Sequence, residues 1–362
     1  MKYNDVRKVK REVKIGGIAI GGKNPIAIQS MTNTDTCAFD ATFRQITALK
    51  EAGCDVVRIT VPSLEAAETV RLLKEKEIGI PIVADIHFDY RIALRCAEYG
   101  IDKIRINPGN IGDDERVKQV ADACRSRNIP IRIGVNGGSL EKNILAEFGG
   151  PTPEALAKSA MYHVSLLEKF DFYNTVISIK ASDVPTMIAA NRLVSSLCDY
   201  PLHIGVTEAG NSNSGLIKSS VGIGSLLCDG IGDTLRVSLT ADPVEEISAA
   251  KRILSAVGIS GQSGMNIVSC PTCGRTKIDL IKLSGEFEKA AGDAGLLDFP
   301  IKVALMGCIV NGPGEAREAD IGIAGGVGEA ALISHGEIIG KIPEDKIIPV
   351  LIDEIKKIKS KG

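Results

Sequence analysis

The stretch Val56-Val-Arg-Ile-Thr-Val-Pro-Ser-Leu-Glu-Ala-Ala-Glu-Thr-Val-Arg-Leu-Leu-Lys74 is one complete βα unit, and its pattern decides the fold expected for the first two thirds of the chain. Its first five residues form an apolar, β-branched run that is typical of a buried strand. Ser63 then precedes a segment with apolar residues at helical spacing, as a capping residue does. The same alternation extends from about residue 25 to 258 and yields eight such units. Eight βα units that close on themselves form a TIM barrel, and the length of this region fits that fold.

The predicted strands of this barrel are short. They cover residues 26–30, 56–60, 82–86, 103–107, 131–135, 176–180, 202–206 and 234–238. We predict that Thr152 and Asp242 cap later helices, and that the glycine-spaced segment 13–24 forms a hairpin at the lower end of the barrel. An open doubly wound sheet is the alternative fold. No GxGxxG motif follows the first strand, where a dinucleotide-binding fold needs its glycine turn, and this disfavours that alternative.

A second, smaller domain is predicted at the C-terminal end of the chain. The composition changes to glycine and serine at residues 258–264, which indicates a boundary between a barrel domain, 1–258, and an α+β domain, 259–362. Within the second domain we expect helices over 277–291 and 344–359 and strands over 302–306 and 320–324.

Composition restricts the class of partner. The 362-residue chain has a net charge of only −2, which argues against nucleic acid or an anionic membrane surface as the main partner. Its N-terminal residues are charged, and no apolar segment long enough for a signal peptide or a membrane span follows them. We therefore predict a soluble cytoplasmic protein.

Cysteines fall into two groups. Three of the nine, Cys270, Cys273 and Cys308, precede Glu315 in the last quarter of the chain, and together these four side chains suit an iron–sulfur cluster with one non-cysteine corner. A carboxylate exchanges more readily than a thiolate, so such a corner is chemically open and indicates reductive chemistry. The other six are expected to be buried small hydrophobic residues, because cytosolic disulfides are rare. They are Cys37, Cys54, Cys96, Cys124, Cys198 and Cys228.

Spacing alone leaves two other interpretations of the C-terminal cysteines open. A zinc site would need a second close Cys/His pair, whereas this part of the chain offers only Cys308 and the distant His335. A thioredoxin-like dithiol would need a strand-to-helix turn in a βαβ context and would leave Cys308 without a role. The iron–sulfur interpretation uses all three cysteines.

Charged and polar residues lie near the ends of strands two to eight, where a TIM barrel carries its active site. They are Arg58, Thr60, Asp85, His87, Arg105, Asn107, Arg132, Asn136, Lys180, Glu208, Arg236 and Ser238. A spacing of two within most pairs directs both side chains to one face of the strand. If that face is inward, five cations converge, and buried cations are too costly to retain without partners. The pattern predicts a small ligand with several negative charges, such as a phosphate or diphosphate; a stabilising ring of salt bridges is the alternative.

Two further residues are candidates for roles beside the cations. Glu208, in Gly-Val-Thr-Glu-Ala-Gly, is the candidate acid or base, although it would need desolvation or a change of partner to carry a proton. Its alternative role is an ion pair with Lys180 or Arg236. His87 is expected either to hydrogen-bond the ligand or to support a neighbouring side chain.

Seven long motifs connect these observations to a known family. They are Gln29-Ser-Met-Thr-Asn-Thr34, Val83-Ala-Asp-Ile-His-Phe88, Arg105-Ile-Asn-Pro-Gly-Asn110, Gly134-Val-Asn-Gly-Gly-Ser139, Gly205-Val-Thr-Glu-Ala-Gly210, Ser269-Cys-Pro-Thr-Cys-Gly-Arg-Thr276 and Met306-Gly-Cys-Ile-Val-Asn-Gly-Pro-Gly-Glu315. Essentially end to end, the chain resembles the 4-hydroxy-3-methylbut-2-enyl diphosphate synthases, the GcpE family, in their bacterial two-domain form. The resemblance implies a TIM barrel joined to a [4Fe-4S] domain. It also implies a two-electron ring opening of 2-C-methyl-D-erythritol cyclic diphosphate, with loss of water, on the methylerythritol phosphate route to isoprenoids.

The resemblance carries over residue by residue. It implies that Cys270, Cys273, Cys308 and Glu315 hold the cluster and that Glu208 is the barrel acid. It further implies diphosphate binding by Arg58, Arg105, Asn107, Arg132, Asn136 and Lys180, to which we add His87 and Arg236 from the barrel pattern. Flavodoxin or ferredoxin is the expected electron donor.

The short connection between the predicted domains bears on assembly. Only about a dozen residues separate the last barrel helix from Cys270, too few for us to expect the small domain to fold over its own barrel mouth. The resemblance implies a head-to-tail homodimer in which the cluster of one chain covers the barrel of the other, and we expect that assembly here. Two other classes are disfavoured. An iron-sensing regulator needs no ring of cations and would need a basic DNA-reading helix. A radical enzyme using S-adenosylmethionine would need three clustered cysteines near the first strand, where only Cys37 occurs.

Overall fold

The computed structural model of the protein describes residues 6–259, 264–297, 299–309, 314 and 316–361. The chain divides into two compact units, Met1–Ile253 and Leu254–Gly362. Each unit has its own buried apolar core. The division at residue 258 expected from the change in composition stays a prediction.

Eight parallel strands form the sheet of the first unit, in the order β8-β7-β6-β5-β4-β3-β10-β9. A parallel bridge between Ile177 and Leu202 joins the two edges, so the sheet closes on itself. This closure confirms the predicted TIM barrel. The strands β9 and β10 are only two residues long and thus shorter than predicted. The bounds are β3 (Ala27–Met31), β4 (Val56–Thr60), β5 (Ile82–Asp85), β6 (Lys103–Ile106), β7 (Ile131–Asn136), β8 (Thr175–Lys180), β9 (His203–Ile204) and β10 (Thr234–Leu235).

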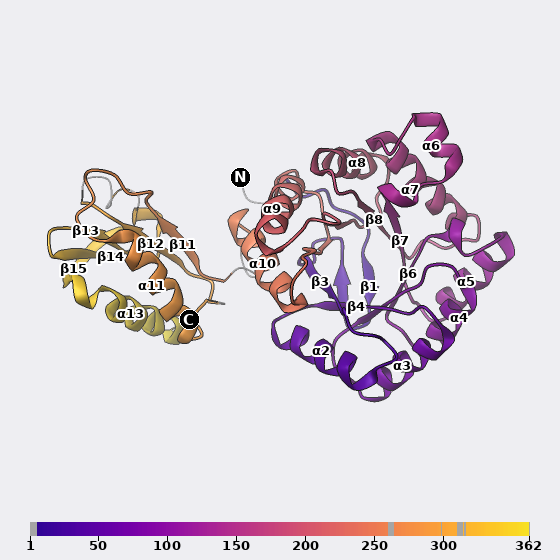
Figure 1. Ribbon diagram of the computed structural model, residues 1–362, viewed down its shortest axis with the longest axis horizontal. Coiled ribbons are helices and arrows are strands. Elements are labelled where there is room, and N and C mark those ends of the chain that lie inside the picture. Colours follow the sequence, from indigo (N-terminus) through magenta and orange to yellow (C-terminus); the bar gives the residue numbers. More distant parts are fainter. Residues whose placement is uncertain (1–5, 260–263, 298, 310–313, 315, 362) are drawn as a thin grey trace. The chain divides into compact units, whose positions relative to one another are not determined.

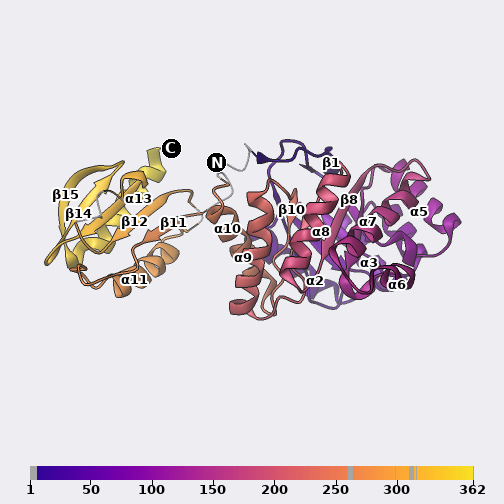
Figure 2. The ribbon, with the colours of Figure 1, turned by 90° about the horizontal axis from the view of Figure 1, so that it is seen from above.

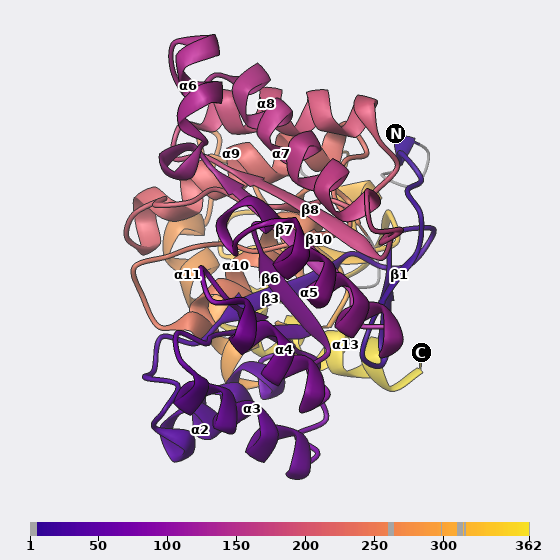
Figure 3. The ribbon, with the colours of Figure 1, turned by 90° about the vertical axis from the view of Figure 1, so that its right-hand side faces the viewer.

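Helices surround these strands on the outside of the barrel (Figures 1 and 3). The predicted caps are present: the side chains of Ser63, Thr152 and Asp242 accept backbone N–H bonds from Ala66, Ala155 and Val244. The helices are α2 (Phe39–Glu51), α3 (Leu64–Glu75), α4 (Tyr90–Glu98), α5 (Asp114–Ser126), α6 (Lys142–Phe148), α7 (Pro153–Glu168), α8 (Val184–Leu197), α9 (Ser212–Cys228) and α10 (Pro243–Ala256), with 3₁₀ turns η1 (Pro108–Asn110) and η2 (Gly137–Ser139).

The amino-terminal end of the barrel is closed by an antiparallel hairpin, β1 (Val13–Ile15) and β2 (Ile18–Ile20), as predicted. Its apolar side chains pack against the first inward residues of four strands, among them Val56, Val83 and Val176. The hairpin lies at one end of the barrel and α6 at the other (Figure 2). The polar inward residues Arg58, Asp85, Arg105 and Lys180 thus lie in the middle or at the carboxyl end of their strands.

The second unit is a five-stranded mixed sheet in sequential order, with α11 and α13 packed on one face. Its elements are β11 (Asn266–Ser269), α11 (Leu280–Asp293), β12 (Lys302–Met306), η3 (Ala316–Glu318), β13 (Ile321–Gly325), β14 (Glu329–Ser334), β15 (Glu337–Pro343), η4 (Glu344–Lys346) and α13 (Ile347–Lys361). Two of these strands and both helices are close to the prediction, whereas β11, β14 and β15 are additional. The final helix begins later than predicted because residues 344–346 form a 3₁₀ turn.

Among the described helices, none combines the length and the apolar character that a membrane span requires.

Candidate functional site

The inward side chains near the carboxyl ends of the strands form a cluster of five cations. Arg58, Arg105, Arg132 and Lys180 come from β4, β6, β7 and β8, and Arg236 directly follows β10. The strand register places Arg105 opposite Arg132 and Asn136 opposite Lys180. Arg132 is the second residue of β7 and lies opposite Val176, whereas Asn136 and Lys180 end their strands, so these predicted residues share the barrel interior without lying at one level of it.

Asp85 at the end of β5 pairs with two of these cations. Its carboxylate lies 3.6 Å from the Arg58 guanidinium and 3.1 Å from that of Arg105. Burial alone would raise the pKa of Asp85, but the charges of Arg58 and Arg105 outweigh it and hold the pKa below its ordinary value. Asp85 thus stays ionised and holds both arginines in the site.

Glu246 on α10 is the partner of Arg236. It was not among the predicted residues, because it lies on a helix and not near the end of a strand. Its two carboxylate oxygens each accept from the Arg236 guanidinium at 3.2 Å, and the Ser30 hydroxyl donates at 2.7 Å. Glu208 is therefore not the partner of Arg236. In the sequence Glu246 stands beside Glu245 in the first turn of a helix, and only the structure shows that it is buried.

Among the described residues, Arg132 and Lys180 have no carboxylate partner. Arg132 is 1% exposed, and its Nε and Nη2 atoms lack hydrogen-bond partners among the described residues. Burial, together with the charges of Arg236 and Arg58, lowers the pKa of Lys180 well below its ordinary value. Five cations thus face two carboxylates, an arrangement that an anionic ligand would neutralise.

A sixth cation, Lys103, was not among the predicted residues. It lies on the inward face of β6, two residues before Arg105, and is completely buried. Its amine has no partner within the described part of the chain, and burial lowers its pKa well below the ordinary value of lysine. Because Lys103 is the first residue of its strand, a rule that considers only the carboxyl ends of strands does not find it.

Asn107 and Gly134 hold the Arg105 side chain. The Asn107 side-chain oxygen accepts the Gly134 N–H at 2.9 Å, and Arg105 donates to the Gly134 carbonyl at 2.8 Å. A Cβ atom at position 134 would lie 2.3 Å from Arg105 Nε. Only glycine therefore leaves room for the guanidinium across β7.

Glu208 and His87 lie at the rim rather than inside. Both are exposed, and Glu208 has a left-handed backbone with φ of 52°. A non-glycine residue in this conformation is uncommon and is enriched at functional sites. No described group forms an ion pair with Glu208, so its carboxylate is accessible to a ligand at the barrel mouth.

The three predicted cysteine ligands lie on two adjoining loops of the second unit. Gly307 N–H donates to the Cys270 thiol at 3.3 Å, which ties the loop before Cys308 to the first cysteine. Thr272, between Cys270 and Cys273, has φ of 64°, a strained value for a β-branched residue. Hydrogen bonds from Arg275 lower the pKa of the Cys273 thiol, which favours the thiolate that metals bind.

These thiols suit a metal cluster in donor chemistry, although they do not form a closed site by themselves. Within the described residues, no three Cys, His, Asp or Glu side chains gather as a metal site. Glu315, the fourth predicted ligand, lies outside the described residues. The three thiols are free, a hydrogen bond ties their loops together, and the pKa of one thiol is lowered. This donor set fits an iron–sulfur group, whose binding would bring the thiolates into their final arrangement.

The expectation that the other six cysteines are buried is wrong for half of them. Cys54, Cys96 and Cys124 are buried, whereas Cys198 is partly exposed and Cys37 and Cys228 are exposed. Cys96 and Cys124 lie on the buried faces of α4 and α5 and Cys54 lies just before β4, whereas the three cysteines that are not buried lie in a loop or at a helix end.

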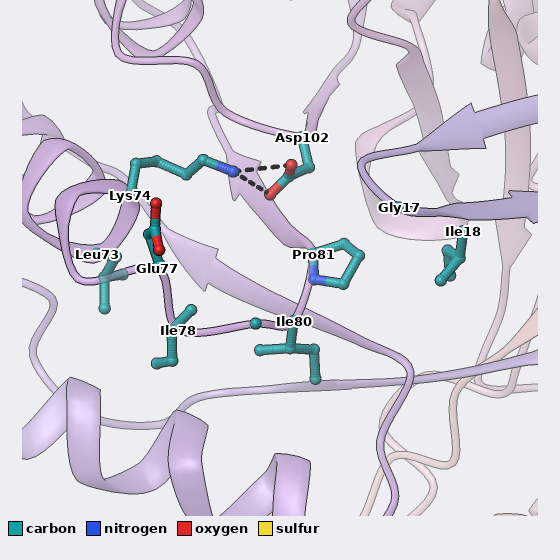
Figure 4. A pocket seen from close by; sticks show the side chains of 10 residues that line it. Gly17, Ile18, Leu73, Lys74, Glu77, Ile78, Ile80, Pro81 and Asp102 are labelled. Atoms are coloured by element: carbon teal, nitrogen blue, oxygen red, sulfur yellow. Dashed lines mark hydrogen bonds and ion pairs between the residues drawn. The ribbon is translucent and has the colours of Figure 1, made fainter.

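A cavity of about 640 Å³ lies at the opposite end of the barrel from this site (Figure 4). It lies beside the hairpin residues Gly17 and Ile18, and the ion pair of Lys74 with Asp102 forms part of its wall. Because its lining carries two carboxylates, Glu77 and Asp102, against one already paired cation, Lys74, it does not resemble an anion site.

Each of the two units matches a known family model. The family model for the GcpE TIM-barrel domain matches residues 10–251, and that for the GcpE protein C-terminal domain matches residues 266–357. A 4-hydroxy-3-methylbut-2-en-1-yl diphosphate synthase (flavodoxin) from Caldanaerobacter subterraneus is 55% identical over 98% of both chains. The enzyme of the same name from Fusobacterium nucleatum is 55% identical over 96% of both chains. Among solved structures, dihydropteroate synthase from Stenotrophomonas maltophilia is 14% identical with a TM-score of 0.49, over 67% of this chain and 97% of that chain.

Proposed function

Since the chain belongs to the GcpE family, we propose that it catalyses the reductive ring opening and dehydration of 2-C-methyl-D-erythritol 2,4-cyclodiphosphate to (E)-4-hydroxy-3-methylbut-2-enyl diphosphate. It is an oxidoreductase of the methylerythritol phosphate route. The reaction takes up two electrons, breaks the ring C–O bond to phosphate and releases one hydroxyl as water. The observation that carries the proposal is the excess of buried cations at the carboxyl end of the barrel.

The barrel binds the diphosphate through its unpaired cations. Arg132 and Lys180 face the ligand without a carboxylate of their own, and Arg105 is held beside them by Asp85 and Gly134. Guanidinium groups match phosphate oxygens in bidentate geometry. Because the site is buried and its donors are already held in place, little reorganisation is needed when the anion enters. Asn107, Asn136, Arg58, Arg236 and His87 complete the proposed set.

The C-terminal loops hold the redox group. Cys270, Cys273, Cys308 and Glu315 are the proposed ligands of a [4Fe-4S] cluster, which supplies single-electron transfer and an exchangeable coordination position when bound. The acidified Cys273 thiol and the loop contact at Cys270 support this assignment. Flavodoxin, named in the relatives, or ferredoxin is the proposed electron donor.

Glu208 is the proposed proton donor to the departing hydroxyl. Its exposed carboxylate at the rim and its left-handed backbone support a role at the reacting end of the substrate rather than in the diphosphate cluster.

We further propose a cytoplasmic enzyme that acts as a head-to-tail homodimer. Ultracentrifugation at the assay concentration tests the dimer, since a strictly monomeric species with full activity would contradict it.

The function is tested on anaerobically purified protein by iron and acid-labile sulfide analysis, turnover of the cyclic diphosphate with reduced flavodoxin, and pyrophosphate binding by calorimetry. We expect about four irons and four sulfides per chain, turnover to the linear diphosphate, and pyrophosphate binding that is lost in Arg132→Met. Stoichiometric zinc without sulfide in an active preparation would refute the redox assignment.

A further inference from the structure

We propose that His163 is a positioning residue that, together with Glu141, holds the turn after Asn107 and the loop after Asn136 in their ligand-binding arrangement. This inference rests on the proposed function, because it treats those two loops as part of the substrate site. His163 lies on the outer helix α7, and the hydrogen bond and the close carboxylate contact described for it reach Gly109 and Glu141, both outside the barrel strands. It therefore acts through the loops and not on the ligand.

The imidazole bridges two segments that are distant in sequence. Its Nδ1 atom accepts the Gly109 N–H at 3.2 Å, and its Nε2 atom lies 2.6 Å from a Glu141 carboxylate oxygen. Because Nδ1 accepts a hydrogen bond, the ring proton must be on Nε2, from which it is donated to Glu141. Burial lowers the pKa of His163 despite the neighbouring carboxylate, with a smaller contribution from the Arg105 charge. The neutral Nε2–H ring satisfies both partners at once.

The first of these segments is the turn that follows Asn107. Gly109 is the middle residue of η1, and a Cβ atom there would lie 2.8 Å from His163 Cε1. Its φ is not in the left-handed region, so the closeness of the ring, not the backbone conformation, requires glycine. On its other side Asn107 is bonded to Gly134. Asn107 thus holds the turn from the barrel side, and His163 holds it from the surrounding helices.

The second segment is the loop after β7. Glu141 precedes α6 and is only 19% exposed in its side chain. Its second carboxylate oxygen is buried and has no hydrogen-bond partner among the described residues. His163 is therefore the contact that holds this carboxylate, and with it the end of the loop that begins at Asn136.

Removing the imidazole would leave two polar groups without their partner, the Gly109 N–H on one loop and the mostly buried Glu141 carboxylate on the other. An unsatisfied buried group is expensive enough for the loop to move and expose it. A small displacement of ligand-binding groups costs affinity even when the fold persists. The arrangement of both loops thus depends on the one imidazole ring of His163.

The test compares His163→Phe, which keeps a ring but neither nitrogen, with Glu141→Gln, which keeps an acceptor for Nε2–H. Val164→Ala is the matched control, because Val164 is the next residue on α7, is equally buried and touches neither loop hydrogen bond. For each holoenzyme we would measure the Kd of inorganic pyrophosphate, KM and kcat for the cyclic diphosphate, Tm, and iron content. Nitrogen-15 NMR of histidine-labelled protein reports the tautomer.

We expect His163→Phe to weaken pyrophosphate binding and raise KM roughly tenfold, with iron content unchanged. Glu141→Gln should stay within about threefold of the wild type. Val164→Ala should lower Tm while Kd and KM stay at their wild-type values. A His163→Phe protein with a lowered Tm but wild-type Kd and KM, or an Nδ1–H tautomer in the wild type, would overturn the proposal. A wild type that binds pyrophosphate without converting the cyclic diphosphate would refute the proposed function, and the pyrophosphate comparison would still decide the role of His163.

Discussion

Replacing Lys103 by methionine should stabilise the protein. The lysine is 0% exposed, and its amine has no partner among the described residues, so folding removes a polar group from water without compensation. Methionine has similar length and no polar head, and fills the same space. An unsatisfied buried polar group costs about 1–3 kcal/mol and a buried charge more, so we expect a gain of about 2 kcal/mol near neutral pH. For a barrel of this size the gain corresponds to a rise in Tm of roughly 4–8 °C.

The gain should depend on pH in a defined direction. Burial lowers the pKa of Lys103 in the folded state, whereas in the unfolded chain the amine keeps its ordinary pKa. The unfolded state therefore binds more protons between those two values, and the wild type becomes more stable as pH rises through that window. The advantage of the methionine variant is largest below the folded pKa and shrinks toward the ordinary pKa of lysine.

Thermal and urea unfolding of wild type and variant at pH 7 and pH 9 measures both effects. Lys118→Met is the control, because Lys118 is exposed on α5 and should change the free energy of unfolding by less than about 0.5 kcal/mol. A Lys103→Met protein that is less stable than the wild type, or whose difference from it does not change with pH, would show that the amine is satisfied in solution and that the reasoning is wrong.

Three further changes test the candidate site. Gly134→Ala should weaken pyrophosphate binding at least tenfold in calorimetry, because its Cβ would displace the Arg105 guanidinium; unchanged binding would mean that Arg105 does not contact the anion. Glu246→Gln should lower the free energy of unfolding in urea by about 3 kcal/mol, since it leaves Arg236 without its buried partner, and an effect below about 1 kcal/mol would indicate that water reaches the pair. Glu208→Gln should reduce kcat about 100-fold or more with pyrophosphate binding retained; normal turnover would remove Glu208 from the role of proton donor.

The barrel and the cation cluster could be predicted because both depend on short-range periodicity. A strand alternates its side chains with period two, so Arg58 and Thr60, and likewise Arg105 and Asn107, were assigned to one face of their own strand without knowledge of the neighbouring strands. The strand 302–306 was predicted with the bounds that the structure has. The hairpin of β14 and β15 was missed, although the turn at His335 and Gly336, both with positive φ, carries a recognisable hairpin signal.

The amino-acid sequence by itself determined the order of strands and helices, the common face of the polar residues within most pairs and, if that face is inward, the expectation of an anionic ligand, since local spacing encodes these features. Only the tertiary structure decided which partner each cation takes. Asp85 bridges two arginines, Glu246 reaches Arg236 from a helix, and His163 contacts a turn 54 residues away in the chain. Such contacts join residues that are far apart in the sequence, so no local pattern predicts them. The closure of the barrel brings these residues together.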